Sequence, residues 1–291
     1  MFESLRQELE HCPLLTNKET IITHLSHLLK KAIGKYECPG IAFSGGLDSS
    51  VLALLAKDPM LYTIALENSS DVIWSLDVAK KLGLRITTKI LSLDEAEQII
   101  KKVVHLLQST DVTHVGIGCV VYAVLEMAKK DGVTLVLGGL GAEEIFGGYL
   151  RHIDYGKDLE NIHERLWDGL RDMETRDFAR DLPIAKHFNI ELQAPFLDES
   201  LVRYAMQIHP SLKINHERRK IILQETAFQL GLPREVAFRK KIAAQYSSKF
   251  DRAIHRLAKR NGFRLKKDYL QSLLKKKKEK NSKTEESIAK A

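Results

Sequence analysis

The sequence predicts an α/β protein built on a doubly wound parallel sheet, with a helical C-terminal part. Short apolar runs alternate with helical patterns in the first half of the chain, and the first run breaks into SGGLDSS before a helix resumes. After about residue 155 only helical patterns remain. Strands that alternate with helices form parallel sheets covered on both faces. These observations place one α/β unit before a helical region.

The first element is a helix over residues 16–33, behind an N-cap at Thr16 or Asn17. Its apolar residues recur at helical spacing: Ile21, Ile22, Leu25, Leu28, Leu29 and Ile33. We therefore expect residues 1–37 to form an N-terminal helical segment ahead of the sheet.

Four strand-helix units follow, and together they predict an α/β core over residues 38–155. The apolar runs that indicate strands cover residues 40–43, 61–66, 85–91 and 133–137. Helical patterns fill residues 48–57, 71–82, 93–108 and 117–130. Such units are joined by right-handed crossovers, and their ligands bind at the carboxyl ends of the strands. SGGLDSS lies at one such end.

Residues 156–262 are expected to be helical and to complete the same domain. Prolines separate the helical patterns, because proline seldom continues a helix: Pro183, Pro195, Pro210 and Pro233. From Arg264 onward, ten Lys or Arg residues face four Asp or Glu residues, so most of the net charge of +7 lies there. We expect residues 263–291 to form a basic, disordered tail.

The composition excludes several classes of protein. The chain has 291 residues, of which 44% are hydrophobic and 29% charged, as in ordinary globular proteins. Its three cysteines show no C-x-x-C spacing, which excludes a disulfide framework and a zinc ribbon. There is no run of eighteen apolar residues, and charges occur throughout the first thirty residues. We therefore expect no membrane span and no signal peptide, and a cytoplasmic location.

The SGGLDSS stretch predicts a phosphate site. The chain contains no G-x-x-x-x-G-K-[ST] sequence, and its GIGCVV and GLGAEE stretches lack the third glycine of a dinucleotide-binding fingerprint. In SGGLDSS, glycines let the backbone approach an anion, and serine hydroxyls offer hydrogen-bond donors. The Asp48 carboxylate suits the Mg²⁺ that accompanies nucleotide phosphates. The loop therefore predicts ATP and Mg²⁺ as ligands.

SGGLDSS resembles the pyrophosphate loop of the N-type ATP pyrophosphatases, or PP-loop superfamily. Three further stretches resemble the synthetase domain of the asparagine synthetase family. GGLGAEEIFGGYLRH (138–152) is similar to SGEGADEIFGGY, ELQAPFLDESLVRYAMQI (191–208) to EARVPFLD, and KIILQETAFQLGLPREVAFRKK (220–241) to K-x-x-L-R-E…LP…R-x-K. The resemblance covers residues 20 to 250 in the family's order and implies an adenine nucleotide alpha hydrolase-like fold of the Rossmann-like type.

The resemblance implies an enzyme that activates a carboxylate as an acyl-adenylate, releases pyrophosphate and forms an amide with ammonia. It implies these pyrophosphate and Mg²⁺ ligands, with Asp48 on the metal: Ser44, Gly45, Gly46, Asp48, Ser49 and Ser50. It places these residues around the adenosine: Phe43, Ile64, Gly138 and Gly139. Lys241 matches the family's R-x-K lysine and is expected to contact the phosphates or the charge that develops in acyl transfer.

The chain departs from the family in two respects. Family members begin with a cysteine nucleophile and a glutaminase domain, whereas this chain has Phe2 and some forty residues before the loop. Nitrogen is therefore expected as free ammonia or from a separate glutaminase subunit. Leu140 stands where the family has a substrate-side glutamate, and Gln193 where it has an arginine. Glu143 and Glu144 are then the candidate catalytic carboxylates.

Three functions remain open at this stage. The first is an ATP-dependent amide-forming ligase that acts on aspartate or a related small-molecule acid. The second is a PP-loop enzyme that adenylates a different acceptor, a tRNA or a protein, with nucleic-acid contact only through the lysine-rich tail. The third is an ATP-binding relative without catalytic activity, for which the replacement at Leu140 is the motive. No membrane partner is expected, and the sequence does not indicate an oligomeric state.

Overall fold

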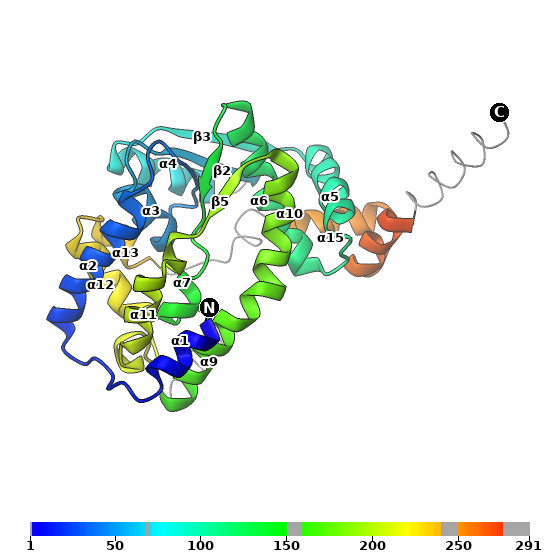
Figure 1. Ribbon diagram of the computed structural model, residues 1–291. Helices are drawn as coiled ribbons and strands as arrows, with labels where there is room; N and C mark the ends of the chain where they lie inside the picture. The colour runs from blue at the N-terminus through cyan, green and yellow to red at the C-terminus, as the bar shows by residue number, and fades with distance from the viewer. Residues whose placement is uncertain (1, 68–69, 150–158, 240–249, 276–291) are drawn as a thin grey trace, which may run out of the picture.

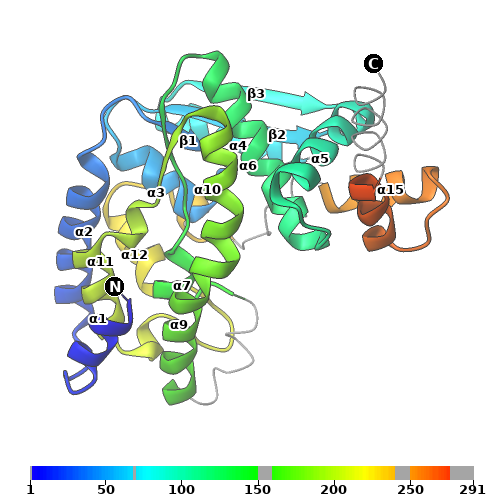
Figure 2. The same ribbon diagram turned by 45° about the vertical axis from the view of Figure 1, so that its right-hand side comes forward.

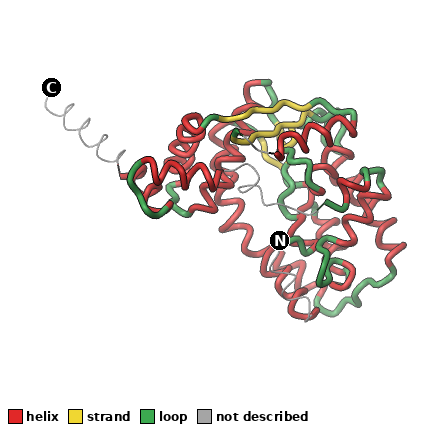
Figure 3. The backbone as a smooth tube through the Cα atoms, turned by 180° about the vertical axis from the view of Figure 1, so that it is seen from behind, coloured by secondary structure: helices red, strands yellow, loops and turns green. Residues whose placement is uncertain are grey.

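The computed structural model describes residues 2–67, 70–149, 159–239 and 250–275. One sheet of five parallel strands runs in the order β3-β2-β1-β4-β5. The strands are β1 (Gly40–Ala42), β2 (Met60–Leu66), β3 (Ile86–Leu91), β4 (Leu135–Leu137) and β5 (Glu191–Gln193). Figure 3 shows them gathered as one layer with helices around it. The predicted doubly wound parallel sheet is confirmed.

Helices cover both faces of this sheet, and the strand side chains alternate between two cores. Leu61 and Leu137 belong to the core that includes α2 (Lys18–Gly34) and α3 (Leu47–Leu55), whereas Tyr62 and Val136 belong to the other. That second core is filled by α5 (Leu93–Leu107), α6 (Val112–Lys130) and α15 (Phe250–Arg260). Neighbouring residues of a strand point to opposite faces, so β2 and β4 contribute to both cores.

Local signals in the sequence set the ends of several helices. The Asn17 side chain accepts a hydrogen bond from the Thr20 amide and caps α2, which decides between the two predicted caps. Ser92 and Glu95 form a capping box at the start of α5. The remaining helix of this unit, α4 (Ser70–Leu82), lies against β2 and β3. The four predicted strand-helix units are therefore present, with ends shifted by a few residues.

The expectation that strands end at about residue 155 is wrong, because β5 pairs with β4. The strand has three residues, of which one is exposed and two are half-buried, so it carries no apolar run. Its hydrogen bonds to β4 define it, and such pairing is not encoded by a local pattern. The C-terminal part therefore contributes to the sheet itself.

A long interrupted helix joins the sheet to the lower part of the molecule in Figures 1 and 2. It consists of α9 (Leu159–Met173), a π-helical turn η1 (Glu174–Phe178) and α10 (Ala179–Phe188). Pro183 lies inside α10 rather than ending it. π-helical turns within α-helices occur frequently at functional sites, because they redirect side chains.

Shorter helices complete the fold around α2 and α9. They are α1 (Phe2–Leu9), α7 (Ala142–Phe146), η2 (Pro195–Leu197), α11 (Glu199–Gln207), η3 (Pro210–Leu212), α12 (Ile221–Gln229) and α13 (Arg234–Ala237). Helices α11 and α12 pack on α2, and α1 packs on α9. The N-terminal helices thus belong to the same packed body as the C-terminal part.

The first residues of the predicted tail are also packed. Residues 266–275 are helical, and Tyr269 is buried with its hydroxyl donating to Glu97 at 3.3 Å. Arg260, on α15, pairs with Asp94 at 2.7 Å and with Glu97. The expectation of disorder from residue 263 is therefore wrong for residues 266–275, and residues 276–291 lie outside the described part of the chain.

In the described part of the chain, α6 alone is long and apolar enough to cross a membrane by length and composition. It packs against α5, α10 and α15. Its buried residues include Cys119, Tyr122 and Leu125. The apolar composition of α6 is explained by this position inside the second core.

Candidate functional site

The switch point of the sheet lies between β1 and β4, since β2 and β3 extend the sheet on one side and β5 on the other. Ligands of doubly wound sheets bind in the crevice at this point. The chain leaves β1 through SGGLDSS and leaves β4 through Gly138, Gly139, Leu140 and Gly141. The two glycine-rich loops of the sequence therefore meet at the switch point.

The conformation of SGGLDSS depends on glycine and on serine hydroxyls. Gly45 has a φ of +66°, and a Cβ atom at this position would lie 2.8 Å from Cδ1 of Trp74. The Trp74 indole donates to the Gly45 carbonyl at 2.8 Å. Ser49 Oγ donates to the Gly46 carbonyl at 3.2 Å and accepts from the Ser44 amide at 3.2 Å. These contacts fix the conformation of the loop at the start of α3.

The second loop approaches the first at Asp48. A Cβ atom on Gly139 would lie 3.1 Å from the Asp48 Cβ, whereas one on Gly138 would meet no atom within 4 Å. The Gly138 amide donates to the Gln193 carbonyl at 2.9 Å, which ties this loop to β5. Gly139 therefore permits the close approach of the two loops.

Asp48, Glu143 and Lys220 form a buried ion-pair cluster. Lys220 Nζ lies 2.7 Å from both carboxylate oxygens of Asp48 and 2.9 Å from Glu143 Oε1. The exposed fractions of these side chains are 5% for Lys220, 13% for Asp48 and 12% for Glu143. Burial lowers the pKa of Lys220, and the Asp48 carboxylate opposes this change. A Cβ atom on Gly148 would fall 1.7 Å from Glu143 Oε2, so only glycine fits beside the cluster.

Lys220 also occupies an uncommon backbone conformation. Its φ of +55° lies in the left-handed region, which non-glycine residues rarely adopt. Its neighbour Arg219 is half-buried and donates from Nη1 to the Gly148 carbonyl at 2.8 Å. Burial lowers the pKa of Arg219, and its charge contributes to the lowered pKa of Lys220. The two adjacent cations therefore lie at the same end of the site.

A cavity of about 1380 Å³ opens at this end of the sheet. Seven of the residues that the sequence predicted for the site line it: Phe43, Ser44, Ile64, Gly138, Gly139, Glu143 and Glu144. Gly45, Gly46 and Asp48 are not among the lining residues, and Ser49 and Ser50 are buried. Lys241 lies outside the described residues. The structure thus gathers three separate stretches of sequence around one cavity.

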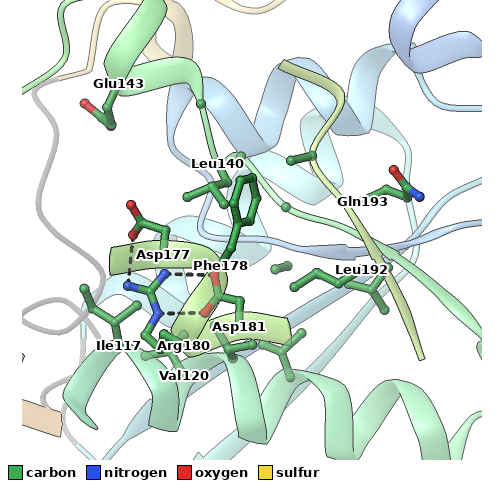
Figure 4. Close-up of a pocket in the computed structure, with 18 of the residues that line it drawn as sticks. Ile117, Val120, Leu140, Glu143, Asp177, Phe178, Arg180, Asp181, Leu192 and Gln193 are labelled. Atoms are coloured by element: carbon green, nitrogen blue, oxygen red, sulfur yellow. Dashed lines mark hydrogen bonds and ion pairs between the residues drawn. The ribbon is translucent and has the colours of Figure 1, made fainter. Parts of the chain in front are cut away.

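The π-helical turn η1 brings a chain of charged side chains to the cavity wall. Arg180 donates to Asp181 at 2.6 and 2.8 Å and to Asp177 at 3.0 Å, as Figure 4 shows. Arg176 donates to Asp177 at 2.7 Å and to Glu144 Oε1 at 2.8 Å. Alternating charges therefore connect this wall to the predicted catalytic carboxylate of α7.

Glu144 is the most deeply buried carboxylate of the cavity wall. Its side chain is 1% exposed, and Oε1 also accepts from the Tyr149 hydroxyl. Oε2 has no hydrogen-bond partner among the residues that the structure describes. Burial raises the pKa of the Glu144 carboxyl, while the Tyr149 hydroxyl and Arg176 oppose that rise. Such a carboxyl group is suited to proton transfer.

Leu140 and Gln193 occupy different sides of the cavity in Figure 4. Leu140, like Phe178 from η1, lines the cavity and packs against the first core. Gln193 donates to Glu191 at 2.6 Å and accepts from the Tyr36 hydroxyl at 3.4 Å. Neither side chain brings a charge to the cavity.

Sequence reasoning missed Lys220, Arg219, Arg176 and Arg180. Lys220 begins the K-x-x-L-R-E-like stretch, so a signal for it was present in the resemblance. Arg176 and Arg180 occur in a helical stretch of ordinary charge density, which carries no local signal. Arg176, on η1, reaches Glu144 of α7, whereas Arg180, at the start of α10, pairs with Asp177 and Asp181.

The carboxylates of Asp48 and Glu143 suit Mg²⁺ only when nucleotide phosphates supply further ligands. Among the described residues, no group of three or more His, Cys, Asp or Glu side chains is arranged to hold a metal. Asp48 and Glu143 both lie within 3 Å of Lys220 Nζ. Mg²⁺ is commonly bound by one or two carboxylates plus phosphate oxygens and water, so two carboxylates suffice.

Sequence comparisons identify relatives of this chain. A family model described as asparagine synthase matches residues 27–182 and 155–289. A Methanocaldococcus jannaschii protein named "Putative asparagine synthetase (glutamine-hydrolyzing) 1" is 32% identical, over 84% of this chain and 52% of the relative. The glutamine-hydrolyzing asparagine synthetase B of Escherichia coli is 30% identical, over 69% of this chain and 40% of the relative.

The chain spans about half the length of the curated relatives it matches. The matched region nevertheless includes the loop, the cavity and the ion-pair cluster described above. By its sequence match and its parallel sheet, this chain belongs to the asparagine synthase family.

Proposed function

We propose that this chain is an ATP-dependent amide-forming ligase. It activates the carboxylate of aspartate or a related acid as an acyl-adenylate, releases pyrophosphate, and then combines the acyl group with ammonia. The observation that carries the proposal is the buried cluster of Asp48, Glu143 and Lys220, which joins SGGLDSS to two of the other family-like stretches. Membership in the asparagine synthase family supports the same general chemistry.

The activation step is assigned to the SGGLDSS end of the cavity. A carboxylate oxygen attacks the α-phosphorus of ATP, and the bond to the bridging oxygen breaks, so that pyrophosphate leaves with the electron pair. The loop residues that hold the pyrophosphate are Ser44, Gly45, Gly46, Ser49 and Ser50. The adjacent cations Arg219 and Lys220 stabilise its charge, since preorganised cations act strongly in a buried site.

Mg²⁺, when bound with ATP, would neutralise charge on the departing pyrophosphate, with Asp48 and Glu143 as its protein ligands. The adenosine is assigned to the strand ends near Phe43, Ile64, Gly138 and Gly139, all of which line the cavity. Lys241 is assigned, by resemblance alone, to the phosphates or the charge of the acyl-transfer step.

The amide-forming step is assigned to the side of the cavity near Glu144. Ammonia attacks the acyl carbon, the bond to the phosphate oxygen breaks, and AMP leaves with the electron pair. The nitrogen then loses one proton, which Glu144 Oε2 accepts. This atom is buried and has no hydrogen-bond partner among the described residues, so it is the available acceptor.

The source of nitrogen is free ammonia or a separate glutaminase subunit in this proposal. The relatives named above are glutamine-hydrolyzing and are longer than this chain. A cytoplasmic location belongs to the same proposal. So does the domain division, with residues 38–155 as the ATP-binding core and residues 156–262 completing it.

The test is to incubate the chain with ATP, Mg²⁺, ammonia and one acid at a time, aspartate included. AMP, pyrophosphate and the amide are measured together, and we expect them in equal amounts. Pyrophosphate with an acid other than aspartate would reject aspartate and retain the class of reaction. No pyrophosphate with any acid would overturn the proposal and favour a nucleotide-binding protein without turnover.

The variant Asp48→Asn provides the matching check. It removes one negative charge from the cluster at nearly constant size, and we expect roughly 100-fold slower release of pyrophosphate. Asp58→Asn, on an exposed turn with a 3.6 Å ion pair to Arg85, is the control and is expected to keep its rate. Equal rates for the two variants would contradict the assignment of Asp48.

A further inference from the structure

Three apolar side chains converge on the side of the cavity that follows β4. They are Leu140, Phe178 and Leu197, which all line the cavity and pack against the first core. Figure 4 labels Leu140 and Phe178 among the residues that line the cavity. A Cβ atom on Gly141 would lie 2.5 Å from Leu197 Cδ2, so Leu197 lies directly on this loop. We call these three side chains the apolar wall.

The apolar wall adjoins the point where the acid must be activated. Leu140 directly follows Gly139, at which a Cβ atom would lie 3.1 Å from the Asp48 Cβ. Asp48 is the residue that pairs with Lys220 at the phosphate end of the cavity. Leu140 lines the cavity next to this loop, so we place the group bonded to the activated carboxyl against its side chain.

Most of the described lysine and arginine side chains around the apolar wall have carboxylate partners. Arg180 pairs with Asp177 and Asp181, and Arg176 pairs with Asp177 and Glu144. On the opposite rim, Lys35 lies 3.3 Å from Asp198. Among the described lysine and arginine residues that line the cavity, Arg219 alone has no carboxylate partner, and it lies beside Lys220 at the phosphate end.

These pairings disfavour an α-amino dicarboxylic acid as the acceptor. Its ammonium group would meet the uncharged side chain of Leu140, which offers no acceptor for the water that the ammonium loses, and this desolvation is costly. Its second carboxylate would have to displace Asp177, Asp181 or Asp198 from an existing ion pair. Breaking a buried pair leaves an uncompensated charge. An apolar carbon skeleton instead gains contact with Leu140, Phe178 and Leu197.

We propose that the acceptor is a carboxylic acid whose carbon skeleton next to the activated carboxyl is apolar and carries no free ammonium group. This inference rests on the proposed function and specifies its substrate class. The reaction is the one already written, with the same bonds formed and broken. The apolar wall binds this skeleton by apolar contact and not by ion pairs. The cavity of about 1380 Å³ has room for such a skeleton beside ATP.

ATP-pyrophosphate exchange with four acids tests this inference on the full chain. The acids are aspartate, succinate, butyrate and 3-phenylpropionate, which successively lack the ammonium group, lack the second carboxylate and add an aromatic ring. We expect exchange to increase in that order, with butyrate exceeding aspartate roughly tenfold or more. Faster exchange with aspartate than with butyrate and 3-phenylpropionate overturns the inference and leaves the proposed function standing. No exchange with any acid overturns both.

The variant Leu140→Glu tests the assigned residue. It restores a carboxylate at this position, and we expect the ratio of aspartate exchange to butyrate exchange to rise roughly tenfold or more. Leu140→Met keeps an apolar side chain of similar size and is expected to retain the ranking of the acids. Circular dichroism and the melting temperature verify that both variants are folded. An unchanged ratio in folded Leu140→Glu would contradict the role of Leu140.

Discussion

The two ends of the cavity differ in what shapes them: mainly the backbone at one end and mainly side chains at the other. At the SGGLDSS end, Gly45 has a positive φ and Gly139 permits the close approach of the two loops. One lysine, Lys220, joins two carboxylates at this end. At the η1 end, side chains dominate, with an apolar wall and paired arginines. Backbone donors suit a phosphate group, whereas side chains of matching shape and charge suit an organic acid. In our proposal the two ends therefore serve the two substrates separately.

The largest effect is expected from removing the cation of the phosphate end. Lys220→Met leaves Asp48 and Glu143 next to each other and buried, so we expect pyrophosphate release to fall by roughly 100-fold or more. Breaking a buried ion pair also costs about 3 kcal/mol of stability. Steady-state kinetics and urea denaturation measure the two effects. Lys57→Met removes the exposed pair with Glu37 and is expected to change neither quantity. Full activity in Lys220→Met would show that the cluster is not part of the site.

A pair of glycine variants tests whether the phosphate end depends on close packing as well as on backbone conformation. Gly45 and Gly83 have nearly equal φ values of +66° and +67°, but only Gly45 is crowded, by Trp74. Both Ala variants incur a left-handed penalty of about 1–2 kcal/mol, and we expect Gly45→Ala to lose additional stability and ATP affinity. Thermal unfolding and calorimetric titration with Mg-ATP measure this. Equal losses would remove Trp74 from the explanation.

At the η1 end, a change in pH dependence is expected. Arg176→Met removes a cation that lowers the pKa of Glu144, so this pKa rises further. Tyr149, Asp177 and Lys220 also face this carboxyl group and are unchanged in the variant. Glu144 must be ionised to accept a proton, so the acidic limb of the rate profile should shift to higher pH.

Amide formation measured from pH 5 to 9 is the relevant assay for Arg176→Met. Arg171→Met, whose partner is Asp168 on the exposed face of α9, is the matched control and should leave the profile in place. A lower rate without a shifted profile would indicate that Arg176 acts on structure and not on the protonation of Glu144.

The smallest effect on the reaction is expected outside the cavity, at a buried lysine that lacks the acidic partners of Lys220. Lys213 is fully buried, and its Nζ has no hydrogen-bond partner among the described residues. Burial lowers the pKa of Lys213 from 10.5 to about 7. Between these values the unfolded chain binds more protons than the folded chain, so this group makes stability rise with pH.

Lys213→Met removes that dependence, and its gain in melting temperature over the original chain should be largest at pH 7 and shrink toward pH 10. His163, whose pKa burial and Lys213 lower to about 4, is neutral throughout this range. Lys129→Met, at an exposed position on α6, is expected to give a difference that does not vary in this way. A gain in melting temperature that does not vary with pH would show that a partner compensates the charge of Lys213 in the folded chain.

Several features were predictable because they are local. The alternation of apolar runs and helical patterns predicts the four strand-helix units, since each strand buried on both faces needs a continuous apolar run. The order of the family-like stretches predicts that Phe43, Ser44, Ile64, Gly138 and Gly139 share one site. The Ser92 capping box and the Asn17 cap are likewise visible in the sequence.

Other features depend on contacts between distant residues. Lys220 pairs with Asp48 across 172 positions, and no local pattern encodes that contact. Strand β5 exists because Leu135, Val136 and Leu137 pair with it, and residues 266–275 fold because Tyr269 is buried next to Glu97. The sequence by itself therefore determined the fold class and the position of the SGGLDSS loop after β1. Only the tertiary structure decided which cations have partners and which side chains line the cavity, because burial and ion pairing are properties of the assembled chain.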